Sequence, residues 1–400
     1  MKEPIIKFEN FGFQYDAQAE PTLKDINLEI FPGEKILIAG PSGCGKSTMT
    51  HCMNGLIPFA YPGESTGKLT IQGKETKHLS IFEISRMVGT VLQDLDGQFI
   101  GLTVAEDIAF ALENACVGQD DMKKTVRQVA HQVGIGDHLE HSPDALSGGQ
   151  KQRVSMAGVM VNEVSILLFD EPLANLDPAT GKKAIEIIDR IQEETGAAVI
   201  IIEHRLEDVL WRDVDRIVLM KDGRIVTDAP PDELLSTDVL LDNGIREPLY
   251  LTALKYAGVK ITPKCHPRGI RSLTLTEEDK HKVRTWFHAR KLAKEKPEGK
   301  ALLTAEKIDF TYDNGFHALK DINISINEGE LLAIVGTNGA GKSTFSKVVC
   351  GFEKQQLGTL TFQGQDMKSY SIKERADRIG YVMQNPNQMI SKSMIFDEVA

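Results

Sequence analysis

The chain has 400 residues, 41% of them hydrophobic and 26% charged, which is enough apolar material for two or three domains. Its net charge of −11 argues against general nucleic-acid binding, which rewards a basic surface. No apolar stretch approaches the roughly 18 residues that span a bilayer, and we expect no signal peptide. The five cysteines form no CxxC pair or metal-ligand spacing, so we expect reduced thiols in the cytosol.

A long internal repeat divides the chain. The segment from Pro21 to Thr48 aligns without gaps with the segment from His317 to Thr344, and more than half of the positions are identical. Two copies this far apart indicate a duplicated domain rather than a solenoid. We therefore predict a complete first domain at 1–245, a linker at 246–301, and the N-terminal part of a second domain at 302–400.

The predicted linker differs in composition from the two copies. It is rich in Lys and Arg, and it ends in a Pro-Glu-Gly-Lys break. We expect a solvated, charged and partly helical connector. The alternative interpretation is a basic contact with a partner or with lipid headgroups.

Three short apolar runs in the first copy are typical of buried strands. They lie at 35–40, 166–170 and 198–203. A stretch with apolar residues at helical spacing, 182–196, lies between the second run and the third. Strands that alternate with helices predict an α/β fold with a parallel sheet.

Each copy contains a GxxxxGK[ST] loop that follows a strand and precedes a helical stretch. Glycines allow backbone amides to approach a phosphate, and the helix N-terminus adds partial positive charge. Lys46 and Lys342 would contact the β- and γ-phosphates, and the Ser47 hydroxyl would be offered to Mg²⁺. We therefore predict that both loops bind nucleotide phosphates. They comprise Gly40, Pro41, Ser42, Gly43, Cys44, Gly45, Lys46, Ser47 and Thr48 in the first copy, and Gly336, Thr337, Asn338, Gly339, Ala340, Gly341, Lys342, Ser343 and Thr344 in the second.

The strand at 166–170 ends in two carboxylates. Ligands of open α/β sheets bind outside the carboxyl ends of the strands, so Asp170 and Glu171 are expected beside the first phosphate loop. Asp170 is placed to hold Mg²⁺ through water, and Glu171 to orient or deprotonate the attacking water. Such a strand end is commonplace by itself. Its position between a phosphate loop and His204 favours the catalytic interpretation.

The segment LSGGQKQR contains Ser147, Gly148, Gly149 and Gln150. A serine and two glycines before a helix make another amide-lined anion site, and Ser147 would also cap that helix. The segment resembles the signature of the ABC ATPases, which closes over the γ-phosphate bound to the opposite module. The resemblance implies tandem P-loop NTPase (ABC ATPase) domains, the second one incomplete. Each would have a RecA-like parallel-sheet core, an antiparallel β subdomain and an α-helical signature subdomain.

The resemblance extends residue by residue and covers nearly everything except the linker. Tyr15 and Tyr312 match the aromatic residue that stacks on adenine. Gln93 and Gln384 match the glutamine that links Mg²⁺ and the attacking water to the transporter contact. His204 matches the switch histidine that contacts the γ-phosphate. The family implies ATP and Mg²⁺ as cofactors, with Glu171, His204 and Gln93 in catalysis and Ser47, Gln93, Asp170, Ser343 and Gln384 at the metal.

Two local patterns narrow the family. The stretches 93–99 and 384–389 look like the Q-x-P-x-x-Q segment of energy-coupling-factor vitamin and metal importers, although Leu95 replaces proline in the first. Residues 201–225 resemble the fused ATPases of that group, including those for thiamine or its hydroxymethylpyrimidine precursor. The resemblance implies an integral-membrane transporter subunit, a separate substrate-capture membrane protein, ABC–ABC dimerisation and a peripheral location on the cytoplasmic face of the membrane.

The second copy stops at Ala400, before a signature, a carboxylate pair or a switch histidine of its own. In ABC dimers each ATP lies between one module's phosphate loop and the other module's signature. The loop at Lys46 therefore lacks an opposing signature within this chain. We expect a truncation, with completion by another ATPase as the alternative, and we expect slow ATP turnover by the chain alone.

Competing functions are distinguished by features outside the phosphate loops. Soluble tandem-ABC factors that act on ribosomes have a longer, strongly helical linker, and they remain the alternative function. DNA-maintenance ABC ATPases usually carry coiled-coil or zinc insertions, and a metabolic kinase would lack LSGGQ. We predict the ATPase subunit of an importer for a vitamin, a vitamin precursor or a metal ion, with no nucleic-acid partner.

Overall fold

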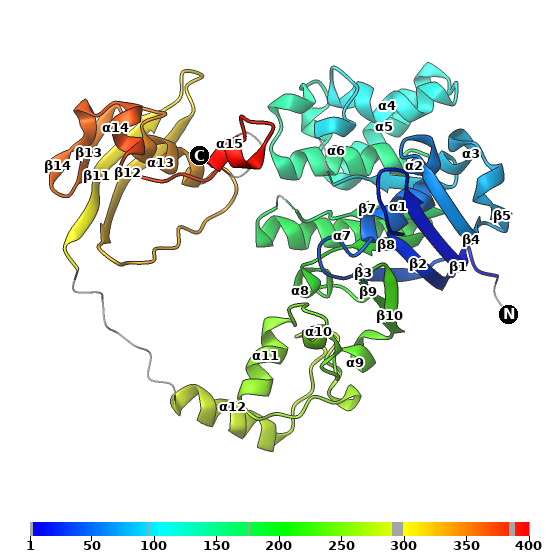
Figure 1. Cartoon of the computed structure of the whole chain (residues 1–400). Coiled ribbons are helices and arrows are strands. Elements are labelled where there is room, and N and C mark those ends of the chain that lie inside the picture. The colour runs from blue at the N-terminus through cyan, green and yellow to red at the C-terminus, as the bar shows by residue number, and fades with distance from the viewer. Residues whose placement is uncertain are drawn as a thin grey trace. The chain divides into compact units, whose positions relative to one another are not determined.

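The computed structural model describes residues 3–93, 96–162, 164–174, 176–289, 299–383 and 389–399. The chain divides into two units, Met1–Lys291 and Leu292–Ala400, which are considered separately (Figure 1).

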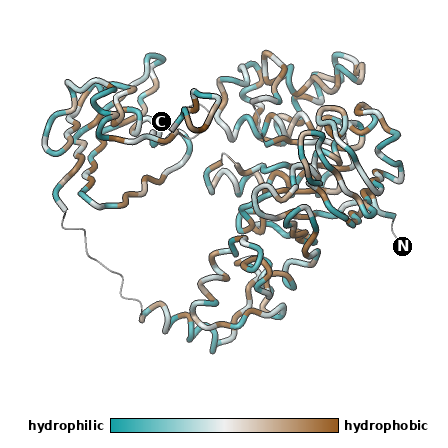
Figure 2. The backbone as a smooth tube through the Cα atoms, in the orientation of Figure 1, coloured by the Kyte–Doolittle hydropathy of each residue, from teal (hydrophilic) through white to brown (hydrophobic). Residues whose placement is uncertain are grey.

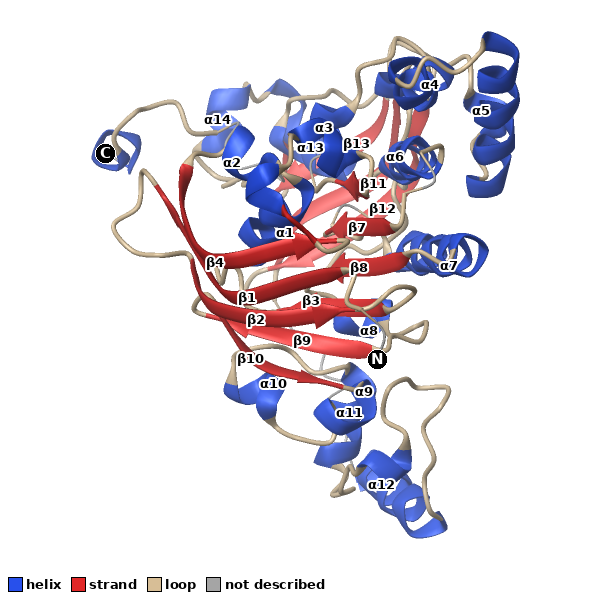
Figure 3. Ribbon diagram, turned by 90° about the vertical axis from the view of Figure 1, so that its right-hand side faces the viewer, coloured by secondary structure: helices blue, strands red, loops and turns tan. Residues whose placement is uncertain are grey.

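A six-stranded sheet forms the centre of the first unit, in the order β10-β9-β3-β8-β7-β6. All neighbouring strands pair in parallel except β10, which is antiparallel to β9. Figure 3 shows β7, β8, β3 and β9 in succession. The parallel α/β sheet expected from the three apolar runs is thus confirmed. Its strands are β3 (Lys35–Ala39), β6 (Val88–Val91), β7 (Ile166–Asp170), β8 (Ala198–Ile202), β9 (Arg216–Lys221) and β10 (Arg224–Ala229).

The central strands are apolar throughout because both faces of this sheet are covered. Successive side chains of a strand point to opposite faces. On β3, Leu37 belongs to a core shared with the helices, whereas Ile36 and Ile38 belong to a core shared with a second sheet. All three side chains are fully buried.

The second sheet is antiparallel, in the order β2-β1-β4-β5, and α1 (Lys46–Asn54) contributes Met49 and Met53 to the same core. The longer helices α4 to α7 pack on the other core. The strands are β1 (Ile6–Tyr15), β2 (Leu23–Ile30), β4 (Gly63–Ile71) and β5 (Lys74–Glu75). The helices are α4 (Val104–Asn114), α5 (Gln119–Val133), α6 (Gly148–Met160) and α7 (Pro178–Thr195), with the shorter α2 (Leu56–Phe59), α3 (Ile81–Ser85), α8 (Leu206–Val209), α9 (Pro231–Leu234) and α10 (Val239–Asp242).

The interval 246–301 differs from the solvated connector that its charge suggests. Helix α11 (Leu249–Tyr256) buries Leu251 and Leu254, and both belong to the helix-side core of the first unit. Val259 and Ile261 follow them into that core. The later helix α12 (Glu277–Ala289) has no fully buried residue, although Val283 on it packs partly buried against the same core. The apolar positions of α11 therefore join it to the first unit, ahead of the charged helix.

The second unit has one sheet within its described residues, in the order β12-β11-β13-β14. This order matches the antiparallel sheet of the first unit. Its elements are β11 (Ala301–Thr311), β12 (His317–Asn327), β13 (Leu357–Phe362), β14 (Gln365–Asp366), α13 (Lys342–Cys350), α14 (Ile372–Ala376) and α15 (Ile395–Val399).

The counterpart of β3 does not form a strand in the second unit. The segment 331–336 is apolar, and it lies in the long brown trace after β12 in Figure 2. Leu331 is 100% exposed and Val335 is 87% exposed. In the first unit β3 pairs with β8 and β9, whereas the described residues of the second unit contain no counterpart of either strand. Without these partners, the backbone of 331–336 has no ladder to join.

The packing of α11 generates a stability prediction. Leu251→Ala should lower the free energy of unfolding of the first unit by about 3 kcal/mol, because a fully buried leucine is replaced by a cavity. Both tryptophans, Trp211 and Trp286, lie in this unit, so tryptophan fluorescence during urea unfolding reports on it. Leu249→Ala on the same helix is the control, since that side chain is 53% exposed. Equal stabilities of the two variants would show that α11 is not part of the core.

Candidate functional site

The first phosphate loop is a tight turn between β3 and α1. Gly43 and Gly45 have φ values of 78° and 102°, in the left-handed region where only glycine is unstrained. A Cβ atom on Gly45 would lie 2.9 Å from a methyl group of Leu23. Lys46, the first residue of α1, is buried, and its Nζ donates to the carbonyl oxygens of Gly40 and Pro41 at 2.9 Å each. The lysine therefore lies across the turn, where a phosphate would take over its hydrogen bonds.

Three aromatic rings, those of Tyr15, Tyr61 and His51, form a cluster at α1, the helix that carries His51. The hydroxyl groups of Tyr15 and Thr48 lie 3.0 Å apart, so β1 is joined to the helix that carries Lys46. Tyr61 packs edge-on against Tyr15, with 6.4 Å between ring centroids, and stacks on His51 at 4.7 Å. The ring of Tyr15 is thus fixed beside the phosphate loop.

The strand register brings the carboxylates to this loop. Asp170 of β7 pairs with Ile202 of β8, and Ile202 pairs with Ile38 of β3. The residues that follow these three positions therefore emerge at one edge of the sheet. Asp170 itself is 3% exposed and forms a side-chain hydrogen bond with Ser47.

Asp170 is a buried carboxyl group with one oxygen unsatisfied. Its Oδ1 has no hydrogen-bond partner within the described residues. Burial raises the pKa of Asp170 to about 6, and the negative charge of Glu171 contributes to this rise. Such a group is suited to a cation, which would neutralise it and occupy the free oxygen.

Three predicted catalytic residues lie together beyond β7. The Nε2 atom of Gln93 donates to one carboxylate oxygen of Glu171 at 2.6 Å, and His204 Nε2 lies 2.6 Å from the other. Glu171 has a φ of 48°, an uncommon value for a residue with a side chain. Its backbone N–H donates to Ile202 at 2.9 Å. The strained turn therefore directs the carboxylate away from the sheet, between the glutamine and the histidine.

Two further residues hold this edge in place, and sequence reasoning missed both. Glu203 is 2% exposed, and its carboxylate accepts from the backbone N–H groups of Leu173 and His204 at 3.1 and 2.8 Å. Burial raises the pKa of Glu203. Arg205 donates to the carbonyl oxygens of Leu173 and Leu176, both at 3.0 Å. The loop after Glu171 and the segment of His204 are thus fastened to each other. The only signal in the sequence was a charged pair on either side of the histidine.

The predicted signature residues begin helix α6. Ser147 is its N-cap residue, and its backbone N–H donates to the Gln150 side chain at 2.8 Å. Gln150 Nε2 also lies 2.9 Å from His138 Nε2. A Cβ atom on Gly149 would lie 2.8 Å from the methyl group of Thr180 on α7. Within the described residues, no hydrogen bond joins residues 147–150 to the first phosphate loop.

The second phosphate loop repeats the local geometry of the first. Lys342 Nζ donates to the carbonyl oxygens of Gly336 and Thr337 at 2.8 and 2.7 Å. The hydroxyl groups of Tyr312 and Thr344 lie 3.0 Å apart, as in the first unit. The described part of this unit has no counterpart of β7 or β8 and so supplies no carboxylate pair here. The predicted residue Gln384 lies outside the described residues.

The residues at the first loop fit Mg²⁺. The Ser47 hydroxyl and the Asp170 carboxylate are oxygen donors, the type that this ion prefers, and one carboxylate oxygen is free. Across the described residues, no group of three or more His, Cys, Asp or Glu side chains is suited to a metal. Mg²⁺ typically combines one or two carboxylates with substrate phosphates and water, which agrees with so small a donor set.

The raised pKa of Asp170 predicts a pH-dependent stability. The folded pKa of about 6 exceeds the unfolded value of 3.8, so the ionised group costs stability, and this cost develops as the pH rises between these values. Asp170→Asn should therefore stabilise the nucleotide-free protein by on the order of 2–3 kcal/mol at pH 8, and much less near pH 4. Urea unfolding at both pH values, without nucleotide or Mg²⁺, measures this difference.

The exposed Asp242 at the end of α10 provides the control, Asp242→Asn. This variant should follow the parent at both pH values. A stabilisation by Asp170→Asn that is the same at pH 4 and pH 8 would contradict the assignment.

Comparison with known proteins places the chain in a family. A family model described as "ABC transporter" matches residues 23–174 and 319–398, and one described as "ATP-binding cassette cobalt transporter" matches 237–310. A Clostridium perfringens protein named as an ABC transporter ATP-binding protein is 55% identical over 399 residues, covering 100% of this chain and 70% of that protein. A similarly named Enterococcus faecalis protein is 56% identical over 401 residues, with the same coverage.

Solved structures give the same result. The structure of cbiO1 from Clostridium perfringens, part of the ABC transporter complex cbiONQ, matches with a TM-score of 0.55 and 29% identity over 64% of this chain and 100% of that chain. The ATP-binding cassette MJ0796, as a dimer bound to ADP and Pi, matches with a TM-score of 0.50 and 28% identity over 56% of this chain and 98% of that one. In the described residues, no helix combines the length and apolarity needed to cross a membrane. With family matches in both units, the chain belongs to the ABC transporter ATP-binding proteins, whose ABC ATPase fold binds and hydrolyses ATP.

Proposed function

We propose that this chain is the ATPase subunit of an energy-coupling-factor importer and that the edge of the sheet beyond β7 is its hydrolytic site. The observation that carries the hydrolytic assignment is the position of Glu171, which is bonded to both Gln93 and His204 beside the loop of Lys46. The wider family of ABC ATPases works with membrane components and dimerises. Our proposal goes further and assigns this chain to the importers within that family.

When the phosphate loop binds the nucleotide, Lys46 would exchange its present hydrogen-bond acceptors for phosphate oxygens. Lys46 now donates to two carbonyl oxygens of its own loop, and the β- and γ-phosphates of ATP would replace them as stronger, charged acceptors. Gly43 and Gly45 have no Cβ atom, so backbone N–H groups of the loop could approach the same phosphates closely. The ring of Tyr15 would stack on adenine. Tyr312 and Lys342 would act in the same way at the second loop.

Hydrolysis would use the carboxylate of Glu171, which is hydrogen-bonded to Gln93 and His204. Glu171 would accept a proton from the water that attacks the γ-phosphate, and Gln93 and His204 would keep that carboxylate aimed at the water. Ser47 and Asp170 would hold Mg²⁺, which would neutralise phosphate charge when bound. His204 would also contact the γ-phosphate, and Ser147 to Gln150 would serve the phosphate loop of a facing module.

The transport class rests on the comparisons and on the position of one segment. The family model described as a cobalt transporter covers 237–310, which includes α11. This helix is buried against the ATPase core and is therefore an integral part of the first unit. The cbiO1 neighbour belongs to a transporter complex. We therefore propose a transmembrane subunit and a separate substrate-capture membrane protein as partners, a peripheral location on the cytoplasmic face of the membrane, and a vitamin, a vitamin precursor or a metal ion as the cargo.

The importer assignment predicts stable membrane partners. Affinity purification of the tagged protein from detergent-solubilised native membranes should recover one integral-membrane subunit in stoichiometric amount and a second, small hydrophobic protein. Mass spectrometry of the eluate identifies both, and the small protein indicates the cargo. A parallel purification from membranes that contain the untagged protein controls for non-specific recovery and should give neither partner.

The alternative, a soluble factor that acts on ribosomes, makes the opposite prediction. The tagged protein would then be recovered with ribosomal proteins or alone in the soluble fraction. That result would overturn the transport assignment and leave the ATP chemistry untouched.

A further inference from the structure

A cavity of about 550 Å³ lies in the first unit, away from the phosphate loop. It is bounded by Lys182 of α7, by the segment from Glu207 to Asp213, and by the loop from Arg268 to Ser272. Its volume is in the range of small-ligand sites, roughly 300–1,000 Å³. None of the residues assigned to nucleotide binding or hydrolysis lines it. The cavity is therefore separate from the proposed nucleotide and hydrolytic site.

Two cations of this cavity are held against an aromatic ring instead of a carboxylate. The guanidinium of Arg271 lies 3.6 Å from the ring centroid of Trp211, and Lys182 Nζ lies 4.4 Å from it. Neither forms an ion pair with a carboxylate in the described part of the chain. Stacking uses the face of a guanidinium and leaves the N–H groups at its edge free to donate. Arg271 and Lys182 therefore offer donors to an anion.

The carboxylates of the cavity wall are already engaged. Glu207 accepts from the backbone N–H of Leu249 at 2.9 Å, and Asp213 lies 3.6 Å from the Nε atom of Arg268. The wall holds the four cations Lys182, Arg212, Arg268 and Arg271 and the two carboxylates Glu207 and Asp213. Arg212 is paired with Glu186 and Asp189, which do not line the cavity, at 3.5 and 3.6 Å, and Arg268 is paired with Asp213. Within the described residues, the cations of the wall without a carboxylate partner are therefore Lys182 and Arg271.

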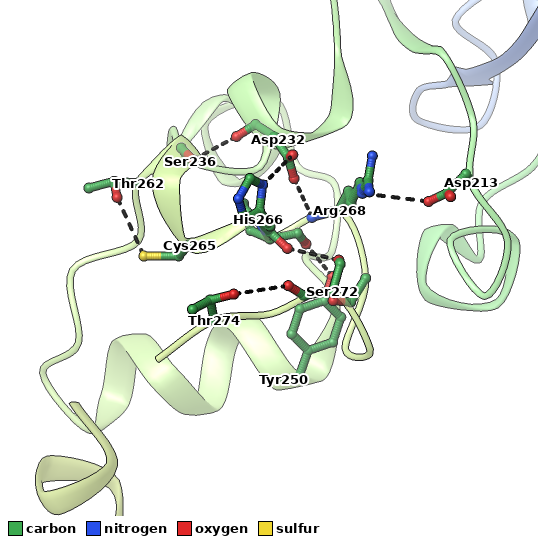
Figure 4. A network of polar contacts seen from close by, with 12 residues as sticks. Asp213, Asp232, Ser236, Tyr250, Thr262, Cys265, His266, Arg268, Ser272 and Thr274 are labelled. Atoms are coloured by element: carbon green, nitrogen blue, oxygen red, sulfur yellow. Dashed lines mark hydrogen bonds and ion pairs between the residues drawn. The ribbon is translucent and has the colours of Figure 1, made fainter. Parts of the chain in front are cut away.

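The loop that carries Arg268 and Arg271 is braced by hydrogen bonds, several of which Figure 4 shows. They anchor it to α9, to α11 and to itself. A braced loop needs little ordering when a ligand arrives, which lowers the cost of binding. The bonds run from Arg268 N to Asp232 at 2.8 Å, from Tyr250 Oη to Pro267 O at 2.6 Å, and from Ser272 Oγ to His266 O at 2.9 Å.

We propose that this cavity binds a small anion, and that Arg271 and Lys182 hold its oxyanion group, a carboxylate or a phosphate ester. Charge-assisted hydrogen bonds from a guanidinium are the usual means of recognising such groups. Leu210, Ile270 and the ring of Trp211 line the same space, which favours a ligand with a nonpolar body behind the anionic group. The cavity adjoins α8, which begins two residues after His204, so the ligand lies where an effector of the ATPase would act.

Fluorescence of Trp211 tests this proposal, because its ring touches both cations. The full chain with Trp286→Phe leaves Trp211 as the sole tryptophan. Pyrophosphate and tricarballylate are the two probes, and the one that gives a saturable change shows whether the site prefers phosphate or carboxylate. Arg271→Ala should weaken that binding roughly tenfold or more, through the loss of a charge-assisted bond. Arg224→Ala, an exposed arginine on β10, should leave it unchanged.

A second variant changes the affinity in the opposite direction, which misfolding could not do. Asp213→Asn removes a negative charge from the wall and frees Arg268, so the probe should bind roughly threefold tighter or more. The proposal is overturned if neither probe gives a saturable change up to about 10 mM. It is also overturned if Arg271→Ala, folded by circular dichroism, binds like the parent, or if Asp213→Asn brings no gain.

Discussion

The parallel pairing of β3, β7 and β8 is the constraint on which the rest of this structure depends. All three strands are buried on both faces, so their sequences are largely apolar along the length of each strand. Register then determines function, because Ile38, Asp170 and Ile202 are neighbours across the sheet. The phosphate loop, Glu171 and the segment of His204 come directly after these strands in the chain. A shift of one residue in any strand would separate these groups.

The same edge shows how folding energy and function are linked. Asp170 is buried with an unsatisfied oxygen, and its raised pKa marks a cost in the nucleotide-free protein. Glu203 is buried too, but backbone N–H groups satisfy it, so it acts as a fastener between two loops. Asp170 is thus a carboxylate suited to binding a cation, whereas Glu203 is a carboxylate that stabilises the fold. The unsatisfied group is the functional one.

The sequence alone predicts the parts that depend on local pattern. The three central strands β3, β7 and β8 follow from apolar runs, and both phosphate loops follow from the spacing of glycines, whereas the role of His204 comes from the resemblance to the ABC ATPases. Glu203 could not be predicted, because a charged residue at a strand end is expected to be exposed, and only tertiary burial shows otherwise. Helix α11 was not predicted as part of the first domain, because the charged residues that follow it made the whole interval 246–301 resemble a linker. The segment 331–336 has the pattern of a strand, yet its conformation depends on partners that the described second unit lacks.

The central claim is that Glu171 makes the edge beyond β7 a site of ATP hydrolysis, and the variant Glu171→Gln tests it most directly. ATP binding and phosphate release should be measured in the complex purified with its membrane partners, with the exposed Glu193→Gln on α7 as control. The account predicts that Glu171→Gln binds ATP within a few-fold of the parent but releases phosphate roughly 10²–10⁴-fold more slowly, since a general base is lost. Unchanged phosphate release would remove Glu171 from the mechanism.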